Sequence, residues 1–172
     1  MTVDPRDELW QVAFETYYDA YYQELLCEKL IGRWQRADEI TRVLVAVTAS
    51  SSAISGWVLW TNPHFRPFWT AVAGLAAFLT IIHAALGVPA RLHDQGDAKR
   101  RWAGLRTDLE TFRYRMKVNP DFPIETFVRD FAGYRKRYGD AIQHSKDDVL
   151  GTHKAQQRVQ DRLNVILIDE IE

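Results

Sequence analysis

Hydrophobic and charged residues are distributed unevenly along this chain. Charged side chains make up 26% of its 172 residues, yet residues 43–90 contain a single one, Arg66. Residues 43–60 and 68–88 are two apolar stretches, each long enough, at about 1.5 Å rise per residue, to cross a hydrocarbon layer about 30 Å thick. A short link joins them, so the pattern predicts an antiparallel transmembrane hairpin.

An alternative for the same stretches is a soluble protein that buries two apolar helices in its core. The hydroxyl side chains of the first stretch make it only moderately hydrophobic, which favours this alternative. Two observations favour the membrane instead. A core helix normally keeps a polar face, and aromatic residues surround the link, where amphipathic rings lie at a membrane interface: Trp57, Trp60, Phe65, Phe68 and Trp69.

Basic residues flank the hairpin and predict its orientation. The link holds a single basic residue, whereas others cluster before the first stretch and after the second: Lys29, Arg33, Arg36 and Arg42, and then Arg91, Lys99, Arg100, Arg101 and Arg106. The positive-inside rule therefore places both termini in the cytoplasm. As membrane-interface anchors we expect Trp57, Trp60 and Trp69 on the outer side, and Arg42 and Arg91 on the cytoplasmic side.

Outside the hairpin, the spacing of hydrophobic residues predicts amphipathic helices. The first covers residues 7–36, and only Gly32 interrupts its continuation into the hairpin. After the hairpin, Pro89 ends or kinks the second stretch. The next helix carries a seam with 3-4-3-4 spacing, which either forms a short coiled coil or docks on the N-terminal helix. The residues of this seam are Trp102, Leu105, Leu109, Phe112 and Met116.

Two further helices are expected toward the C-terminus. The sequence from Asn119 to Pro123 breaks the seam helix, and the next helix begins near Pro123 and stops at Gly139. Ser145 followed by Asp148 resembles a cap that begins the last helix. The predicted fold is therefore all-α, with three parts: an N-terminal amphipathic helix over residues 1–42, a transmembrane hairpin over 43–88 and a cytoplasmic helical bundle over 89–172.

One face of the first apolar stretch carries hydroxyl groups at i, i+3, i+4 and i+7, from Thr48, Ser51, Ser52 and Ser55. In an oligomer these hydroxyls could line a narrow aqueous path by replacing part of an ion's hydration. The same residues are also small enough for close packing between membrane helices. His83, the ionisable residue deep in the second stretch, is either a gating element or a neutral, hydrogen-bonded histidine. These residues are therefore candidates for a pore-lining or an inter-helix face.

Composition and motifs give no sign of an enzyme. The formal net charge is −1, so there is no overall attraction to nucleic acid, and direct nucleic-acid binding stays open. The single cysteine, Cys27, and the scattered histidines show no metal-ligand spacing. The basic triplet at 99–101 could contact a phosphate, but such a triplet is a weak signal by itself. We expect no catalytic residue, cofactor or metal; an enzyme with a site between subunits is a third possibility.

Four segments of the chain carry a resemblance to a known family. They are the tyrosine-rich N-terminal helix, the basic GRWQRADEITR segment, the compact hairpin with its TNPHFRP turn, and the charged helix RLHDQGDAKRRWAGLRTDLETFRYRM. In this arrangement the chain resembles the SLATT family of bacterial two-transmembrane proteins, found in conflict systems beside nucleotide-signal synthases, SLOG sensors or reverse transcriptases. The likeness lies in the architecture, because fixed catalytic residues do not define that family.

The resemblance implies a homo-oligomeric effector in the bacterial inner membrane, which compromises the membrane when a partner protein of the same anti-phage system senses infection. Its partners would be the lipid bilayer, further copies of the chain, and that sensor or signal-producing protein. The alternative function is a membrane-anchored helical scaffold or regulator without pore activity.

Overall fold

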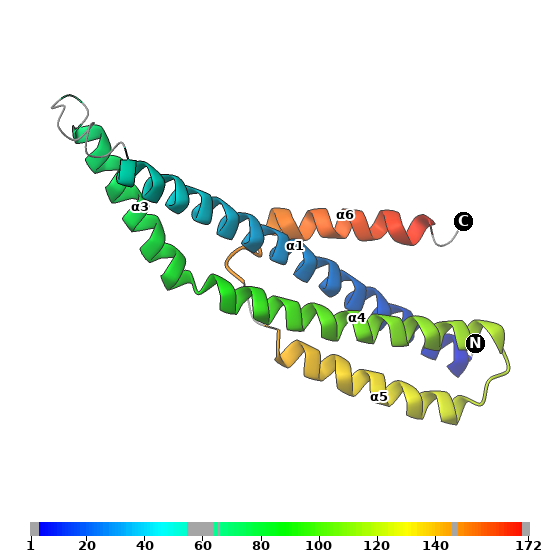
Figure 1. Cartoon of the computed structure of the whole chain (residues 1–172). Helices are drawn as coiled ribbons and strands as arrows, with labels where there is room; N and C mark the ends of the chain where they lie inside the picture. The colour runs from blue at the N-terminus through cyan, green and yellow to red at the C-terminus, as the bar shows by residue number, and fades with distance from the viewer. Residues whose placement is uncertain (1–3, 55–63, 65, 146–147, 170–172) are drawn as a thin grey trace. The chain divides into compact units, whose positions relative to one another are not determined.

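The computed structural model describes residues 4–54, 64, 66–145 and 148–169 (Figure 1). Within these residues the chain is all-helical, with five helices and no strand, which confirms the predicted fold class. The helices are α1 (Pro5–Ile54), α3 (Arg66–Leu86), α4 (Val88–Val118), α5 (Ile124–Gln143) and α6 (His153–Asp169).

Helix α1 begins where the sequence provides an N-cap. The Asp4 carboxylate accepts a hydrogen bond from the Arg6 backbone N–H at 2.9 Å. Pro5 is the first helical residue, a position at which its missing N–H needs no partner. The helix then runs without a break past Gly32 to Ile54. The N-terminal amphipathic helix and the start of the first apolar stretch are therefore one helix.

The described helices do not support the finer part of the predicted fold, the transmembrane hairpin. Over the described residues, none combines the length and the hydrophobicity that a membrane crossing requires. Both predicted stretches, 43–60 and 68–88, include positions that lie outside the described residues or side chains.

Helices α3 and α4 meet at Gly87, which has a positive φ of 57°. A residue in this left-handed conformation commonly ends a helix, and glycine adopts it without steric cost. The Gly87 carbonyl accepts a hydrogen bond from the Arg91 N–H at 3.0 Å, which begins the next helix. Pro89 lies in the first turn of α4, where proline is tolerated. The helix therefore breaks at Gly87, two residues before Pro89, where the sequence predicts the break.

The predicted break between α4 and α5 is confirmed, and Pro123 is the N-cap of α5. The predicted stop at Gly139 is wrong, because α5 continues to Gln143. Glycine inside a helix costs only about 1 kcal/mol relative to alanine. Burial of Ala141 in the following turn favours the helix, and the chain continues through the glycine.

The predicted cap of the last helix is also wrong, because α6 starts at His153 and not near Ser145. The Asp148 carboxylate instead accepts a hydrogen bond from the Leu150 N–H at 2.8 Å and another from Gln95 Nε2 at 3.0 Å. A carboxylate that bonds the N–H two residues ahead stabilises a turn. Asp148 therefore shapes the link before α6 and ties it to α4.

By its internal packing the chain divides into two units. The first unit comprises the described residues up to Ile31 together with those from Asp94 on, and the second unit is Gly32–His93. Helices α1 and α4 contribute residues to both. In the first unit, parts of α1, α4, α5 and α6 bury one hydrophobic core.

The seam predicted on α4 lies inside this core. Its five residues are each at most 3% exposed: Trp102, Leu105, Leu109, Phe112 and Met116. Toward α5, the Phe112 ring lies 5.3 Å from that of Phe127 and 5.4 Å from that of Tyr134, distances typical of favourable ring pairs. From α1, Ala13 and Tyr17 belong to the same buried cluster. Helices of the same chain therefore cover the seam.

Candidate functional site

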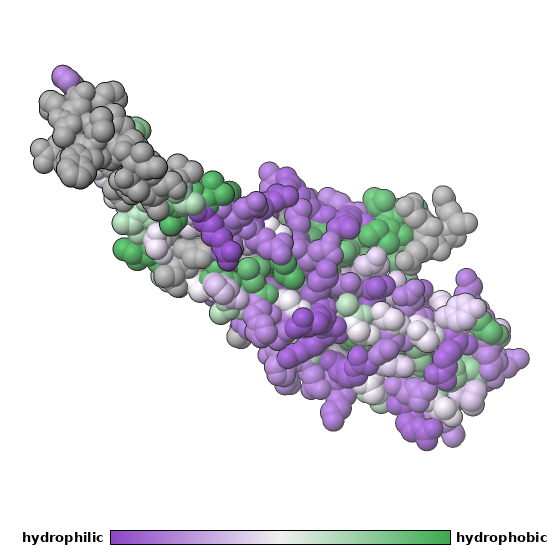
Figure 2. Space-filling model, in the orientation of Figure 1, coloured by the Kyte–Doolittle hydropathy of each residue, from purple (hydrophilic) through white to green (hydrophobic). Residues whose placement is uncertain are grey.

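The second unit exposes large hydrophobic side chains on both of its long helices (Figure 2). On α1, Ile40 is 61% exposed and Val43 is 56% exposed. On α3, exposure lies between 58% and 67% for Phe68, Leu75, Phe78 and Ile81. At about 100° per residue these four residues fall within a sector of about 140°, which we call the exposed apolar face. Burying one such side chain contributes about 1.5–3 kcal/mol, so a protein in water normally hides them.

The structure places the predicted pore or inter-helix residues only in part. The backbones of Thr48, Ser51 and Ser52 lie in α1, and that of His83 lies in α3. Their side chains lie outside the described part of the structure, and so does the whole of Ser55. The choice between a pore-lining and a packing face therefore stays a prediction.

Of the predicted membrane anchors, the two arginines are described. Arg42 is exposed, and its Nε lies 2.9 Å from the Asp38 carboxylate one turn earlier on α1. Arg91 is half-buried near the start of α4. The side chain of Trp69 on α3, and all of Trp57 and Trp60, lie outside the described residues.

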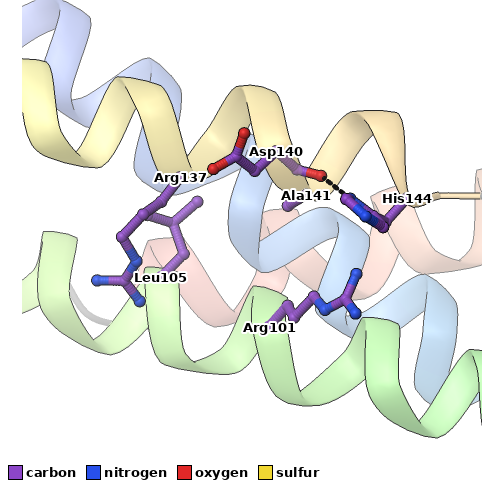
Figure 3. A pocket seen from close by; sticks show the side chains of 6 residues that line it. All are labelled: Arg101, Leu105, Arg137, Asp140, Ala141 and His144. Carbon is purple, nitrogen blue, oxygen red and sulfur yellow. Dashed lines mark hydrogen bonds between the residues drawn. The ribbon is translucent and has the colours of Figure 1, made fainter.

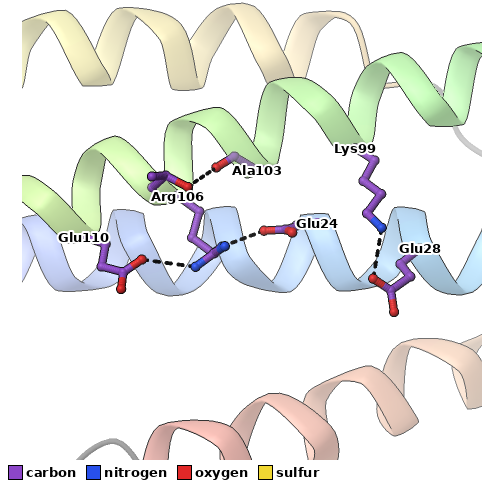
Figure 4. A network of polar contacts seen from close by, with 7 residues as sticks. Glu24, Glu28, Lys99, Ala103, Arg106 and Glu110 are labelled. Carbon is purple, nitrogen blue, oxygen red and sulfur yellow. Dashed lines mark hydrogen bonds and ion pairs between the residues drawn. The ribbon is translucent and has the colours of Figure 1, made fainter.

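A ladder of ion pairs joins α1 to α4 (Figure 4), and a further ion pair joins α1 to α6 within the first unit. Arg106 Nε of α4 donates to Glu24 Oε2 at 2.6 Å. One turn farther along α1, Glu28 accepts from Lys99 of α4 at 3.0 Å and from Arg162 of α6 at 3.4 Å. Glu28 therefore connects two helices to α1 at once.

These contacts shift the pKa values of an acidic residue, Glu28, and of a basic residue, Arg106. The hydrogen bond from Lys99 lowers the pKa of Glu28 below its ordinary value of 4.5, and the Arg162 charge adds to this effect. Burial by itself would lower the pKa of Arg106, but the hydrogen bond and the charge of Glu24 outweigh it, so this pKa is raised. Both groups are held in their charged forms, and the ladder persists at neutral pH.

The aromatic residues of the N-terminal helix surround a cation of the same chain. The Arg113 guanidinium lies 5.2, 4.7 and 4.6 Å from the ring centroids of Trp10, Phe14 and Tyr17. A cation over an aromatic face is attracted by the negative charge density of the ring. These rings therefore pack against α4, which assigns them a structural role.

A pocket of about 490 Å³ lies between α4 and α5 in the first unit (Figure 3). Leu105, 1% exposed, and Ala141, 7% exposed, give it apolar walls. The rest of its lining is polar, with Arg101 from α4, Arg137 and Asp140 from α5, and His144 at the C-cap of α5. The lining residues recur at helical spacing, i and i+4 on α4 and i, i+3, i+4 and i+7 on α5, so each set lies on one face.

The chain matches no known protein family, no curated protein and no solved structure.

Among the described residues, no three histidine, cysteine or acidic side chains gather where they could hold a metal ion. Cys27 is 4% exposed, and burial raises the pKa of its thiol to about 11, so the thiol is protonated at neutral pH. What this part of the chain presents to its surroundings is an apolar face on α3 and a charged pocket between α4 and α5.

Proposed function

We propose that this protein is an oligomeric membrane effector whose hairpin, residues 43–88, enters the bacterial inner membrane while the first unit stays in the cytoplasm. The observation that carries this proposal is the exposed apolar face of α3, together with the exposed Ile40 and Val43 of α1. Apolar surface costs about 25 cal/mol per Å² in water, and lipid contact removes this cost. The scarcity of charge in the same stretch, with Arg66 alone, supports the proposal.

Assembly of several copies is part of the proposal. A subunit with two spanning helices is too small to enclose an aqueous channel by itself. The hydroxyl groups of Thr48, Ser51, Ser52 and Ser55 would supply polar groups along a path between copies. Small residues at these positions would also let neighbouring helices pack closely, so one helix face would serve both purposes.

Such an effector must stay closed until it is needed. The resemblance to SLATT proteins suggests that a sensor or signal-producing protein of the same anti-phage system supplies the trigger. A trigger that opens nearly all copies must favour the open state by about 5.5 kcal/mol. Because α1 belongs to both units and the Glu24 and Glu28 ion pairs hold it, a rearrangement of the first unit would be a route for that signal.

Membrane potential is the measurement that tests this function. A voltage-sensitive dye reports depolarisation in bacteria that carry the full chain with its genomic neighbours and are infected with phage. We expect depolarisation with the native chain and none with the double variant Ser51→Leu, Ser52→Leu, which should still insert because leucine favours a spanning helix. Ser50→Leu, on the opposite side of the same helix, is the matched control and should keep the leak. A membrane that stays polarised with the native chain would contradict the proposal.

A membrane-anchored scaffold is the second candidate, and the first unit favours it. That unit buries its core among its own helices and presents a pocket between α4 and α5. Replacing residues 43–88 by an unrelated transmembrane hairpin separates the two candidates. A scaffold continues to protect the cells after this exchange, whereas a pore-forming effector does not.

A further inference from the structure

Arg101 differs from the neighbouring cations of α4 in its contacts. Lys99 pairs with Glu28 at 3.0 Å, and Arg100 pairs with Asp97 one turn earlier. Among the residues that the structure describes, the Arg101 side chain has no ion pair or hydrogen bond. It is exposed and lines the pocket between α4 and α5. Its N–H donors are therefore available to a ligand.

Two groups of α5 add hydrogen-bond donors to the same pocket. Arg137 uses Nη1 to pair with Asp108, which leaves its other N–H groups for a ligand. His144 Nδ1 lies 2.7 Å from the Asp140 carbonyl oxygen, and because a carbonyl only accepts, Nδ1 carries a proton. The other ring nitrogen, Nε2, donates to a ligand only when both ring nitrogens carry a proton.

We infer that this pocket binds a small organic phosphate, in particular a phosphate monoester. Guanidinium groups match phosphate oxygens with pairs of parallel hydrogen bonds, so Arg101, whose guanidinium lies on the side of His144 in Figure 3, suits this anion. Arg137 adds positive charge on the other side of Leu105. The volume of 490 Å³ lies within the range of about 300–1,000 Å³ typical of small-molecule sites. The apolar walls formed by Leu105 and Ala141 accommodate the carbon part of the ester.

The Asp140 carboxylate restricts which phosphate compounds fit. It lines the same pocket, so it repels a ligand that is anionic at both ends. Figure 3 shows this carboxylate turned away from Arg101. A phosphate at Arg101 and a hydroxyl group toward Asp140 satisfy both residues. The phosphate ester of a polyol has this chemistry, whether it is free in solution or forms the headgroup of a lipid.

This inference does not depend on the proposed membrane function. The lining residues that the structure describes all belong to the first unit. A chain that binds the phosphate without depolarising a membrane would contradict only the proposed function, and the reverse result would contradict only the site.

Isothermal titration calorimetry on the full chain in a neutral detergent tests the site with two probes that share a phosphate monoester on glycerol. Glycerol 3-phosphate represents the free source, and hexanoyl lysophosphatidic acid, which keeps one glycerol hydroxyl, represents the lipid headgroup. Saturable binding of glycerol 3-phosphate supports a free phosphate ester as the ligand, and binding of the lipid alone supports a headgroup. The absence of saturable binding with both probes would overturn the inference.

Variants of neighbouring arginines make the test specific. Arg101→Gln should weaken binding of the successful probe at least about 10-fold, because a charge-assisted contact is lost. Arg100→Gln removes the same charge one residue away and, as the matched control, should change Kd less than about 2-fold. Equal losses in the two variants would indicate diffuse charge attraction and would overturn the site.

Asp140→Asn provides a test in the opposite direction. Removal of the carboxylate charge should tighten binding of the same probe several-fold, because the repulsion of the phosphate disappears. Circular dichroism checks that each variant is folded, which we expect for Arg101→Gln because that side chain is exposed and pairs with no described residue. Weaker binding to Asp140→Asn would contradict a phosphate in this pocket.

Discussion

Arg106 Nε of α4 lies 2.6 Å from Glu24 Oε2 of α1, and these side chains are only 25% and 14% exposed. Water and salt screen a sheltered pair less than a surface pair, and the charges strengthen the hydrogen bond. The same arginine reaches Glu110 of its own helix at 3.2 Å, but that side chain is 56% exposed. The two glutamates therefore differ in how much they stabilise the first unit.

Glu24→Gln should lower the free energy of unfolding by about 1–3 kcal/mol, because a half-buried guanidinium loses its counter-charge. Glu110→Gln is the matched control and should cost less than about 0.5 kcal/mol. Urea unfolding followed by circular dichroism measures both. Equal losses would show that burial of the pair does not strengthen it.

Glu28 should make stability depend on pH on the acid side. Its pKa in the folded state lies below the ordinary 4.5, so it stabilises the fold above that pH, and this contribution is lost as the pH falls through the folded-state pKa. Because the side chain is 44% exposed, the contribution should stay below about 1 kcal/mol. The measurement is the free energy of unfolding at neutral pH and at about pH 3. Glu28→Gln should reduce the difference, and an unchanged difference would contradict the assignment.

Cys27 should be unreactive in the folded protein. Burial raises the pKa of its thiol from 9.0 to about 11, so little thiolate is present at neutral pH. Because the folded-state pKa is the higher one, this group favours folding below pH 9.0, and the contribution is lost as the pH rises toward 11. The chain has a single cysteine, so a thiol-reactive dye reports on this residue alone. We expect slow labelling in buffer and rapid labelling in denaturant; rapid labelling in both would contradict the burial.

Phe78→Lys tests the exposed apolar face. In a spanning helix, a lysine near the bilayer centre costs about 2.5–3.5 kcal/mol, so the variant should shift from the membrane fraction to the soluble fraction. Tyr114→Lys, at a position 67% exposed on α4, is the control and should leave the distribution unchanged. Alkaline extraction of membranes followed by immunoblotting measures it. If both variants distribute between the fractions as the native chain does, the result would contradict contact between α3 and lipid.

Hydrophobic spacing predicts the helices because each of them must bury one face. The five seam residues of α4 show this, since a 3-4-3-4 pattern places them along one stripe and all are buried. Helix ends follow weaker, local rules. At Gly139 burial of the next turn outweighs the cost of glycine in a helix, and at Asp148 a turn and a bond to Gln95 replace the expected cap.

The pocket and the ion-pair ladder depend on contacts between helices that are distant in the sequence. Glu24 and Glu28 lie four residues apart, and Lys99 and Arg106 lie seven apart, so the spacing places each pair on one helix face. The spacing does not show which helix faces pack against each other. Arg101 and Arg137 line one pocket only because α4 and α5 pack at a particular rotation, which is set by the core and not by any local pattern.

The junction between α3 and α4 requires a backbone conformation at Gly87 that favours glycine or a D-amino acid over an L-amino acid. A side-chain carbon added there would meet no atom of the described residues within 4 Å, so these residues leave space for a side chain. The obstacle is the φ of 57°, which costs an L-amino acid about 1–2 kcal/mol. A D-alanine introduced by chemical synthesis would adopt this angle without strain, and it would stabilise the fold relative to glycine by restricting the unfolded chain. The left-handed backbone conformation of this one glycine thus separates two long helices that have no loop between them.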